Sequence, residues 1–421
     1  MIHIQLSHYI DPGTGSMLFT LLIGLITTGY FFLRKVIIKA RFMLSGGNVQ
    51  GKDEGKLPYV IFSDHKRYWN VFKPICDEFE RRGLELHYWT ASPDDPALTT
   101  PYEHVTCEFI GEGNKAFARL NMMNADIVLS TTPGLDVLQW KRSKDVDWYV
   151  HTFHSIASAV TYRMFGLDYY DAILLSGGFM ADEIRTLEEL RGIPPKELEV
   201  VGCTYLDAMA ERKTNMERPH YDRPCVLLAP SWGASSVLSV YGSKIIDALL
   251  ATGYEVVIRP HPQSMTTEKD LLDRLMEAYP DSDDLCWHFD NDNFEILNRC
   301  DVMISDFSGV VFDFALVFDK PVIYTKGTFD NSVYDAAWLE EPLWQFSAYS
   351  RLGIELSEEQ FPRMREVIDS VIYDEALADG REQVREEGWA YIGESALRTV
   401  DYLVRKHDEL EAGYIQSEKG K

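Results

Sequence analysis

Short apolar runs alternate with longer amphipathic stretches along most of the chain. In the first half, the runs that we expect to be strands are 59–63, 84–89, 105–110, 126–130, 148–151 and 172–176. The pattern restarts after the charged, proline-containing segment 211–224, with expected strands at 225–229, 255–259, 301–305 and 321–324. Apolar runs of this length, separated by helix-length segments, are typical of parallel sheets covered by helices on both faces. The pattern therefore predicts an α/β protein with two Rossmann-like, doubly wound domains, at 58–215 and 216–408, and a polar tail at 409–421.

One apolar run is longer than the others and precedes both domains. Met17–Leu33 contains no charged residue, basic residues gather at 34–41, and residues 1–16 contain neither Lys nor Arg. A run of this length is just long enough to span a bilayer, and the basic flank favours the cytoplasmic side. We therefore expect a short extracytoplasmic tail at 1–16, a membrane anchor helix at 17–40 and a linker at 41–57. The expected location is the cell membrane, single-pass or membrane-associated, with the body in the cytoplasm.

Two other interpretations of this run stay open. It is also compatible with a helix buried in a soluble core, or with a cleaved signal peptide. A signal peptide normally begins with a basic region, which residues 1–16 lack, so cleavage is disfavoured.

Charge and cysteine usage narrow the classes of partner. The 421 residues contain 41 Lys plus Arg and 66 Asp plus Glu, a formal net charge of −25. Such a chain is repelled by phosphate backbones, so nucleic acid is not an expected partner. The six cysteines are scattered without metal-binding spacing, which is typical of reduced thiols and predicts neither a disulfide framework nor a metal site.

Two doubly wound domains place a ligand cleft at the carboxyl ends of their strands. The first segment expected there is Trp148–Ser155, where a strand runs into His151, His154 and Ser155. A histidine at a strand exit, beside serines able to begin a helix, suits a general base next to an anion site. The alternative is that one histidine packs in the core and the other is solvated.

The second segment is Val256–Pro262, where a strand ends in Arg259 and His261, each followed by a proline. Proline holds the preceding backbone extended, so both side chains are presented rigidly at the edge of the sheet. Guanidinium and imidazole groups held in this way suit a diphosphate. A stiff loop with exposed charges is the alternative.

The third segment is Asp301–Asp313, where a strand turns into a helix through small polar residues. Free N–H groups around Ser308 and Gly309 would cradle a phosphate, with Ser305 beside them. Asp306 and Asp313 would accept ribose or substrate hydroxyls, although Asp306 also suits a helix cap.

Two further features are weaker candidates. Ser231 and Ser235 lie in another hydroxyl-rich turn between a strand and a helix. The aromatic run Tyr334–Tyr349 suits an acceptor site or membrane contact, but core packing accounts for it more simply.

Together these segments resemble the CDP-glycerol glycerophosphotransferase family of teichoic-acid-type polymer synthesis, over roughly residues 125–400. Arg259-Pro260-His261-Pro262 is similar to the family's R-x-H-P element. Ser305–Ala315, followed by Lys320–Tyr324, is similar to its T-D-Y-S-S-x-x-x-D-F-A…K-P-I-x-F block. Gly202–Asp207 stands where the family has G-x-P-R-x-D, and Gly393–Ala396 resembles its closing segment.

The resemblance implies a GT-B-type fold whose C-terminal domain holds a CDP-activated donor, CDP-glycerol or another CDP-alcohol. The lack of a His/Cys ligand cluster favours a reaction without a catalytic metal, and no cofactor is predicted. The family's W-H-G-T-P-L-K motif aligns with Phe153-His154-Ser155, which makes His154 the expected general base. His261, Ser308 and Gly309 would then hold the diphosphate.

The chain departs from the family in its first domain. Ser155 replaces the family's glycine, the T-P-L-K continuation is absent, and Thr204-Tyr205 replaces Pro-Arg. The donor domain is therefore better supported than the acceptor domain.

We expect a membrane-anchored transferase that moves glycerol phosphate, or a related polyol phosphate, from a CDP-activated donor to a hydroxyl of a lipid-linked or glycan acceptor, with release of CMP. A nucleotide-sugar glycosyltransferase or epimerase of GT-B architecture is one alternative, and a catalytically silent nucleotide-binding or scaffold protein is another. The sequence does not predict the oligomeric state.

Overall fold

The computed structural model describes residues 55–216, 222–290, 292–327, 330–340, 342–372 and 374–419, with side chains described up to Gly413. Lys56–Lys421 forms one compact unit. The predicted tail at 1–16, the predicted anchor at 17–40 and most of the linker at 41–57 lie outside the described residues. Within the described ranges, we find no helix with both the length and the apolar character that a membrane crossing requires.

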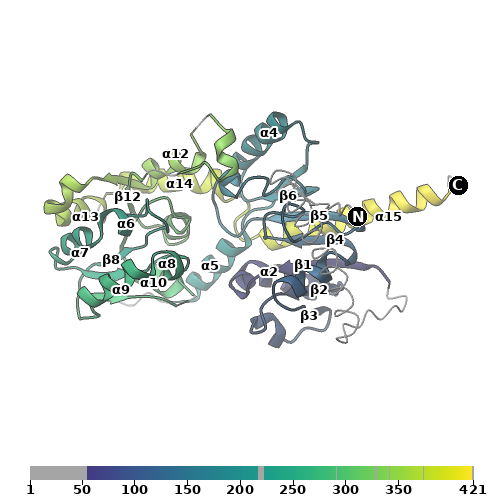
Figure 1. Cartoon of the computed structure of the whole chain (residues 1–421), viewed down its shortest axis with the longest axis horizontal. Coiled ribbons are helices and arrows are strands. Elements are labelled where there is room, and N and C mark those ends of the chain that lie inside the picture. Colours follow the sequence, from purple (N-terminus) through teal and green to yellow (C-terminus); the bar gives the residue numbers. More distant parts are fainter. Residues whose placement is uncertain are drawn as a thin grey trace, which may run out of the picture. The chain divides into compact units, whose positions relative to one another are not determined.

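The first half of this unit contains a parallel sheet with strand order β3-β2-β1-β4-β5-β6-β7 (Figure 1). Its strands are β1 (Leu57–Ser63), β2 (Leu86–Thr90), β3 (Val105–Phe109), β4 (Asn124–Ser130), β5 (Asp145–Thr152), β6 (Ala172–Leu175) and β7 (Glu197–Val200). The strand order reverses between β1 and β4, and a ligand crevice is expected where a doubly wound sheet reverses in this way.

The second half contains another parallel sheet, with strand order β10-β9-β8-β11-β12-β13 (Figure 1). Its strands are β8 (Cys225–Leu228), β9 (Glu255–Ile258), β10 (Leu285–Trp287), β11 (Val302–Ser305), β12 (Val322–Thr325) and β13 (Gly353–Leu356). Here the order reverses between β8 and β11. We call the parts built on the two sheets the first and second lobes.

The helices follow the strands in alternation, as the sequence pattern predicts. They are α2 (Trp69–Arg82), α3 (Asn114–Leu120), α4 (Phe179–Arg191), α5 (Thr204–Thr214), α6 (Val237–Tyr241), α7 (Ser243–Leu250), α8 (Ser264–Thr267), α9 (Lys269–Ala278), α10 (Phe294–Arg299), α11 (Val310–Phe312), α12 (Trp344–Leu352), α13 (Met364–Ile372), α14 (Ala376–Gly388) and α15 (Ser395–Lys419). A π-helical segment, Asp313–Val317, continues α11.

Successive side chains of a strand point to opposite faces of the sheet, so each sheet has an apolar core on both of its faces. In β1, Ile61 packs in a cluster with α2, whereas Val60 and Phe62 pack in the opposite cluster with α3 and α4. In β8, Val226 and Leu227 divide in the same way between the two clusters of the second sheet. Apolar side chains on both faces are what a parallel sheet covered by helices requires. The two predicted doubly wound domains are therefore present.

The last helix crosses the predicted domain boundary. α15 runs from Ser395 to Lys419 and packs on α2 and β4 of the first sheet (Figure 1). Its residues Val400, Tyr402 and Leu403 belong to the core cluster that contains Ile61. Burial of these side chains brings the helix back to the first lobe, and the tail expected at 409–421 begins within the same helix.

Candidate functional site

The carboxyl ends of β8 and β11 are joined by the side chains that follow β11. Ser305 donates from its hydroxyl to the carbonyl of Ala229 at 2.6 Å. The buried carboxylate of Asp306 accepts the backbone N–H of Ser231 at 2.9 Å and that of Val237 at 2.7 Å. Burial raises the pKa of Asp306, and these N–H donors oppose the rise. Ser305 and Asp306 therefore shape the 230–236 turn.

A cavity of about 440 Å³ opens between this turn and the start of α11. Its lining comes from the segments that follow β8, β9, β11 and β12 in the second lobe, with Thr161 added from the first lobe. The lining residues include Ser231, Trp232, Ser235, His261, Ser308 and Gly309. The structure thus brings together five predicted residues, Ser231, Ser235, His261, Ser308 and Gly309, at the point where the second sheet reverses its strand order. Arg259, Ser305, Asp306 and Asp313 are not among the lining residues. The volume falls within the range for small-molecule sites.

Arg259 and His261 lie on the rigid turn after β9. A guanidinium nitrogen of Arg259 contacts Nδ1 of His288 at 2.6 Å. Nδ1 of His261 accepts the backbone N–H of Gln263 at 3.1 Å, which places the proton of the neutral ring on Nε2. Burial, aided by the charge of Arg67, lowers the pKa of His261 to about 4. His261 is therefore a neutral hydrogen-bond donor at the edge of the cavity.

His154 follows β5 in the first lobe, and its ring is fixed from two sides. Its Nδ1 lies 3.1 Å from Oγ1 of Thr131, and its ring centroid lies 4.9 Å from that of Tyr68. Burial, aided by the charge of Arg67, lowers the pKa of His154 to about 4. A neutral ring whose Nδ1 proton is donated to Thr131 leaves Nε2 able to accept a proton.

His151 lies in the core of the first lobe. Its side chain is fully buried, and rings of Phe153, Tyr162 and Tyr170 surround it at centroid distances of 5.1, 5.4 and 5.0 Å. Burial lowers its pKa to about 3. Such a histidine supports the packing beneath His154 and has no direct access to the cavity lined by His261.

The segment after His154 reaches the second lobe. A β-carbon added to Gly309 would lie 3.9 Å from Oγ of Ser155. Ile156 packs in the cluster that contains Val311, and the backbone N–H of Ser158 donates to the side chain of Gln345 at 3.2 Å. The expected helix start at Ser155 or Ser158 is a short 3-10 turn, Ala159–Thr161. The segment 154–158, which begins with His154 and which we call the strap, therefore contacts the second lobe beside Gly309.

A buried ion pair joins the lobes a little further along. Asp335, which is 1% exposed, pairs with Arg191, and it accepts the backbone N–H groups of Phe165 at 2.7 Å and Gly166 at 3.2 Å. Arg191 also pairs with Asp168 at 2.5 Å. We call Arg191, Asp335 and Asp168 the interlobe clamp. It holds the aromatic segment from Tyr334 against the first lobe.

Asp313 lies deeper than the cavity. It begins the π-helical segment, is 6% exposed, and its Oδ1 has no hydrogen-bond partner. Burial raises its pKa to about 8, so the carboxyl group is protonated at neutral pH. Its charge, when present, acts on Tyr205 and Cys203 at the start of α5.

Several polar residues near the site were not found from the sequence. Asp64 and Arg67 follow β1, and Glu183 lies on α4 with one carboxylate oxygen accepting the N–H of Ala159 at 2.8 Å. Burial raises the pKa of Glu183 to about 6. Asp64 and Arg67 could have been predicted as site residues, since they follow an apolar strand. Glu183 lies in an amphipathic helix, where nothing in the sequence distinguishes it from a surface residue.

A second cavity, of about 420 Å³, adjoins the first through Asp306 and Phe307. Its other walls come from β12, β13 and α12, and include Tyr324, Phe346 and Tyr349. Much of the aromatic run 334–349 is therefore packed around this region and the interlobe clamp.

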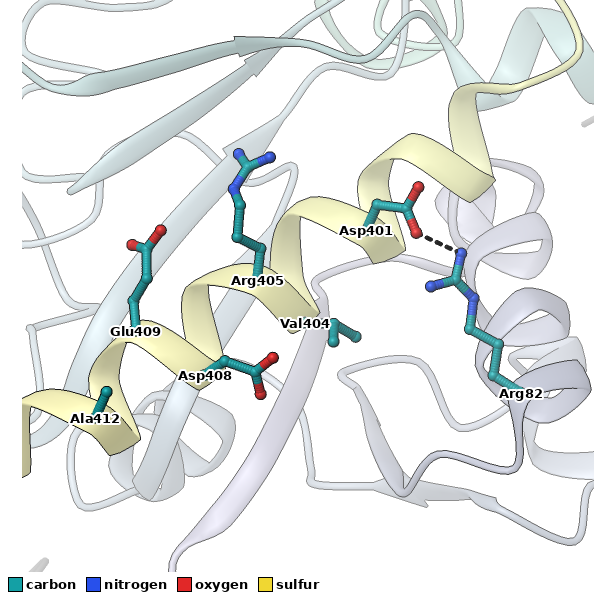
Figure 2. Close-up of a pocket in the computed structure, with 7 residues that line it drawn as sticks. All are labelled: Arg82, Asp401, Val404, Arg405, Asp408, Glu409 and Ala412. Carbon is teal, nitrogen blue, oxygen red and sulfur yellow. Dashed lines mark ion pairs between the residues drawn. The ribbon is translucent and has the colours of Figure 1, made fainter. Parts of the chain in front are cut away.

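A hollow on the surface of α15 contains none of the predicted site residues. Figure 2 shows Arg82 and Asp401 pointing toward one another across it, with an ion pair of 2.7 Å. Arg405 in the same hollow pairs with Glu199 at 3.1 Å. Within the described ranges, the one group of three possible metal ligands is His407, Asp408 and Glu411 on this helix. The hollow therefore lies where α15 packs against α2, and both of its arginines are engaged in ion pairs.

Comparison with solved structures defines the class of fold. The wall teichoic acid polymerase TagF matches with a TM-score of 0.58 at 14% identity, over 90% of this chain and 98% of that chain. The UDP-GlcNAc 2-epimerases of Neisseria meningitidis (TM-score 0.54, 9% identity, 83% and 100% covered) and Methanocaldococcus jannaschii (0.52, 14%, 83% and 100%) also match. At these identities the likeness shows the fold, which is the predicted two-lobed GT-B type.

Comparison with protein families identifies the chain more closely. Residues 204–337 match the family described as CDP-Glycerol:Poly(glycerophosphate) glycerophosphotransferase. The resemblance predicted from the motifs is thus confirmed over these residues, which make up about a third of the chain. The match is shorter than the predicted 125–400: it contains His261 and Ser308 but leaves His154 outside. No curated protein sequence matches the chain.

Proposed function

We propose that the protein transfers glycerol phosphate, or a related polyol phosphate, from a CDP-activated donor to a hydroxyl group of a lipid-linked or glycan acceptor. The observation that carries the proposal is the cavity of about 440 Å³, where His261, Ser308 and Gly309 meet the strap that carries His154. The family match covers the second-lobe part of this site. One of the similar TagF structures was obtained with CDPG, and a donor of this class agrees with the proposal.

In this proposal the second lobe binds the donor diphosphate. The N–H groups around Ser308 and Gly309 and the Nε2–H of His261 donate to its oxygens, and Arg259 supplies positive charge. Ser305 and Asp306 hold the turns in place, whereas Asp313 is buried behind the cavity and makes no contact with the donor in this proposal. Positioning and charge stabilisation of this kind supply most of the catalysis in phosphoryl transfer.

The first lobe supplies the base. Nε2 of His154 accepts the proton of the acceptor hydroxyl while the hydroxyl oxygen bonds to the phosphorus that carries the glycerol. The bond from that phosphorus to the bridging oxygen of the diphosphate breaks, and the electron pair leaves with CMP. The oxygen of Thr131 that faces Nδ1 holds the ring in the tautomer that this step requires.

A membrane location completes the proposal. The apolar run 17–33 with its basic flank would hold the enzyme beside a lipid-linked acceptor, with the catalytic body on the cytoplasmic side. Membrane association of the full-length chain, tested by carbonate extraction, would support this part, and release of the chain by carbonate would contradict it.

The experiment follows CMP release by the purified full chain from CDP-glycerol, with a lipid-linked saccharide in detergent micelles as acceptor. We expect His154→Ala to lower the rate by about 10²–10⁴-fold. His104→Ala, at an exposed histidine, is the matched control and should retain wild-type activity. Turnover of a UDP-sugar with no CMP release from any CDP-alcohol would refute the proposal in favour of a GT-B glycosyltransferase or epimerase. Nucleotide binding without turnover of any donor would favour a silent binding protein.

A further inference from the structure

Arg67 lies at the carboxyl end of β1, next to the point where the first sheet reverses its strand order. It belongs to the short 3-10 turn Lys66–Tyr68, directly after β1. β1 and β4 are the strands between which the order of the first sheet reverses, and Thr131, which contacts His154, directly follows β4. Because crevices for ligands form at the carboxyl ends of such strands, the turn after β1 faces the same crevice as His154.

Arg67 is linked to His154 through one aromatic ring. Its guanidinium carbon lies 5.3 Å from the ring centroid of Tyr68, and the Tyr68 ring lies 4.9 Å from the ring of His154. Cation, phenol ring and imidazole therefore stand in a row, with Thr131 behind the imidazole. This row holds the guanidinium in place without an ion pair.

The charge of Arg67 is not matched by a carboxylate in contact with it. Its neighbour Lys66 pairs with Asp94, whereas Arg67 is exposed and makes no ion pair with any carboxylate that the structure describes. Asp64 is near enough to feel its charge, but Oδ1 of Asp64 is buried without a hydrogen-bond partner. In a chain of net charge −25, an arginine left in this way is available to an anion.

The same charge acts on the histidines of both lobes. After burial, Arg67 is the largest influence that lowers the pKa of His154 in the first lobe and that of His261 in the second. A guanidinium whose charge acts on both rings lies near both of them. His261 lines the cavity with Ser308 and Gly309, so a phosphate group bound there lies within the field of Arg67.

We propose that Arg67 is a direct contact to the diphosphate of the donor, reaching from the first lobe to the oxygens of the phosphorus that undergoes attack. The inference rests on the proposed function and adds to it a residue outside the matched segment 204–337. The planar guanidinium donates two parallel hydrogen bonds to phosphate oxygens, which a lysine at this place does not reproduce. Charge that accumulates on these oxygens during transfer is stabilised from the side of the acceptor.

The proposal is tested by binding and by turnover in the full chain. The variants are Arg67→Ala, Arg67→Lys and the matched control Lys66→Ala, whose partner Asp94 is exposed. Binding of inorganic pyrophosphate, CDP and cytidine is measured by calorimetry, and circular dichroism melting checks the fold of each variant. CMP release from CDP-glycerol is measured with and without added guanidinium ion at millimolar concentration.

We expect Arg67→Ala to weaken pyrophosphate and CDP binding by about tenfold or more, to leave cytidine binding unchanged, and to lower kcat by about 10²-fold with partial rescue by guanidinium. Arg67→Lys should retain part of the affinity but little of the rate, and Lys66→Ala should match the wild type. Wild-type affinity of Arg67→Ala for pyrophosphate and CDP would overturn the proposal, and so would equal loss of cytidine binding, which indicates a structural role.

These readouts separate the two proposals. If the wild type turns over no CDP-alcohol but binds pyrophosphate in an Arg67-dependent manner, the proposed function fails while Arg67 remains an anion contact. If the wild type turns over CDP-glycerol and Arg67→Ala does so equally well, only the inference about Arg67 fails.

Discussion

Replacing Asp335 by alanine removes the carboxylate that joins the segment 330–340 to the first lobe. The side chain is 1% exposed and serves three partners, namely Arg191 and the backbone N–H groups of Phe165 and Gly166. Arg191 keeps Asp168 but loses its other counter-charge while it stays buried. Removing one partner of a buried, hydrogen-bonded ion pair costs about 3–5 kcal/mol, because the remaining charge is left uncompensated.

This free energy converts into a measurable shift in melting temperature. Unfolding entropy of about 2.1 cal/mol/K per residue gives roughly 0.8 kcal/mol/K for a unit of the size of Lys56–Lys421. Asp335→Ala should therefore lower Tm by about 4–7 °C. Differential scanning calorimetry measures the shift, and Glu340→Ala, an exposed acid in the same segment, is the control.

The clamp also predicts an effect on activity. Asp335 holds the aromatic segment from Tyr334, which lines the same cavity as His261, against the first lobe. At a temperature well below the Tm of both proteins, Asp335→Ala should therefore raise KM for the donor by a larger factor than it lowers kcat. A Tm shift of less than about 1 °C, with unchanged KM, would refute the reasoning that the clamp is a compensated buried charge pair.

Because the pKa of His154 is lowered to about 4, the base that we propose is neutral over the physiological range, and kcat/KM should stay flat from about pH 5.5 to 7.5 and fall as pH drops through 4. Gly177→Ala should cost about 1–3 kcal/mol in thermal unfolding, since the added β-carbon would lie 2.2 Å from the carbonyl oxygen of Glu387. Asp313→Asn should raise Tm at alkaline pH, because the wild-type carboxyl, with its pKa raised to about 8, favours the native state progressively less as pH rises from about 4 to 8.

Each of these has a clear control or contrary result. A pH–rate profile that falls near pH 6.5, the ordinary value for histidine, would contradict the neutral base at His154. Gly178→Ala is the matched control for Gly177, since nothing lies within 4 Å of its added β-carbon. Equal dependence of Tm on pH for Asp313→Asn and the wild type would show that this carboxyl is ionised in the native state.

The pattern of apolar runs predicted the central strands but missed three others. The missed strands are β7, β10 and β13, and each lies at an edge of its sheet. β7 reads Glu-Leu-Glu-Val and is only half-buried, and β10 has three residues. An edge strand has one neighbour and needs fewer apolar side chains, so three of the four edge strands form no distinct apolar run, and β3 is the exception. Central strands such as β11 are buried on both faces and are visible in the sequence.

Some features of the candidate site could be predicted from the local sequence, whereas others depend on contacts between distant segments. The residues after β9 and β11 were predicted because each follows a buried strand, and parallel strands place such residues at one edge. That Asp306 anchors the turn at 231–237, and that Ser155 reaches Gly309, depends on contacts between distant segments. Asp335 was hidden within an aromatic run, and nothing in its neighbours indicates the pairing with Arg191 across 144 residues.

The net charge of −25 bears on the acceptor as well as on the exclusion of nucleic acid. A growing polyglycerol phosphate chain is itself a polyanion, and an acidic body repels it wherever the two approach within the screening length of about 8 Å. The groups that we propose as contacts to the donor are two cations, Arg259 and Arg67, and the neutral donor His261, and together they suffice for one diphosphate. A processive polymerase would need a longer basic track to hold its product. The charge distribution therefore favours addition to a short or nearly neutral acceptor over polymerisation.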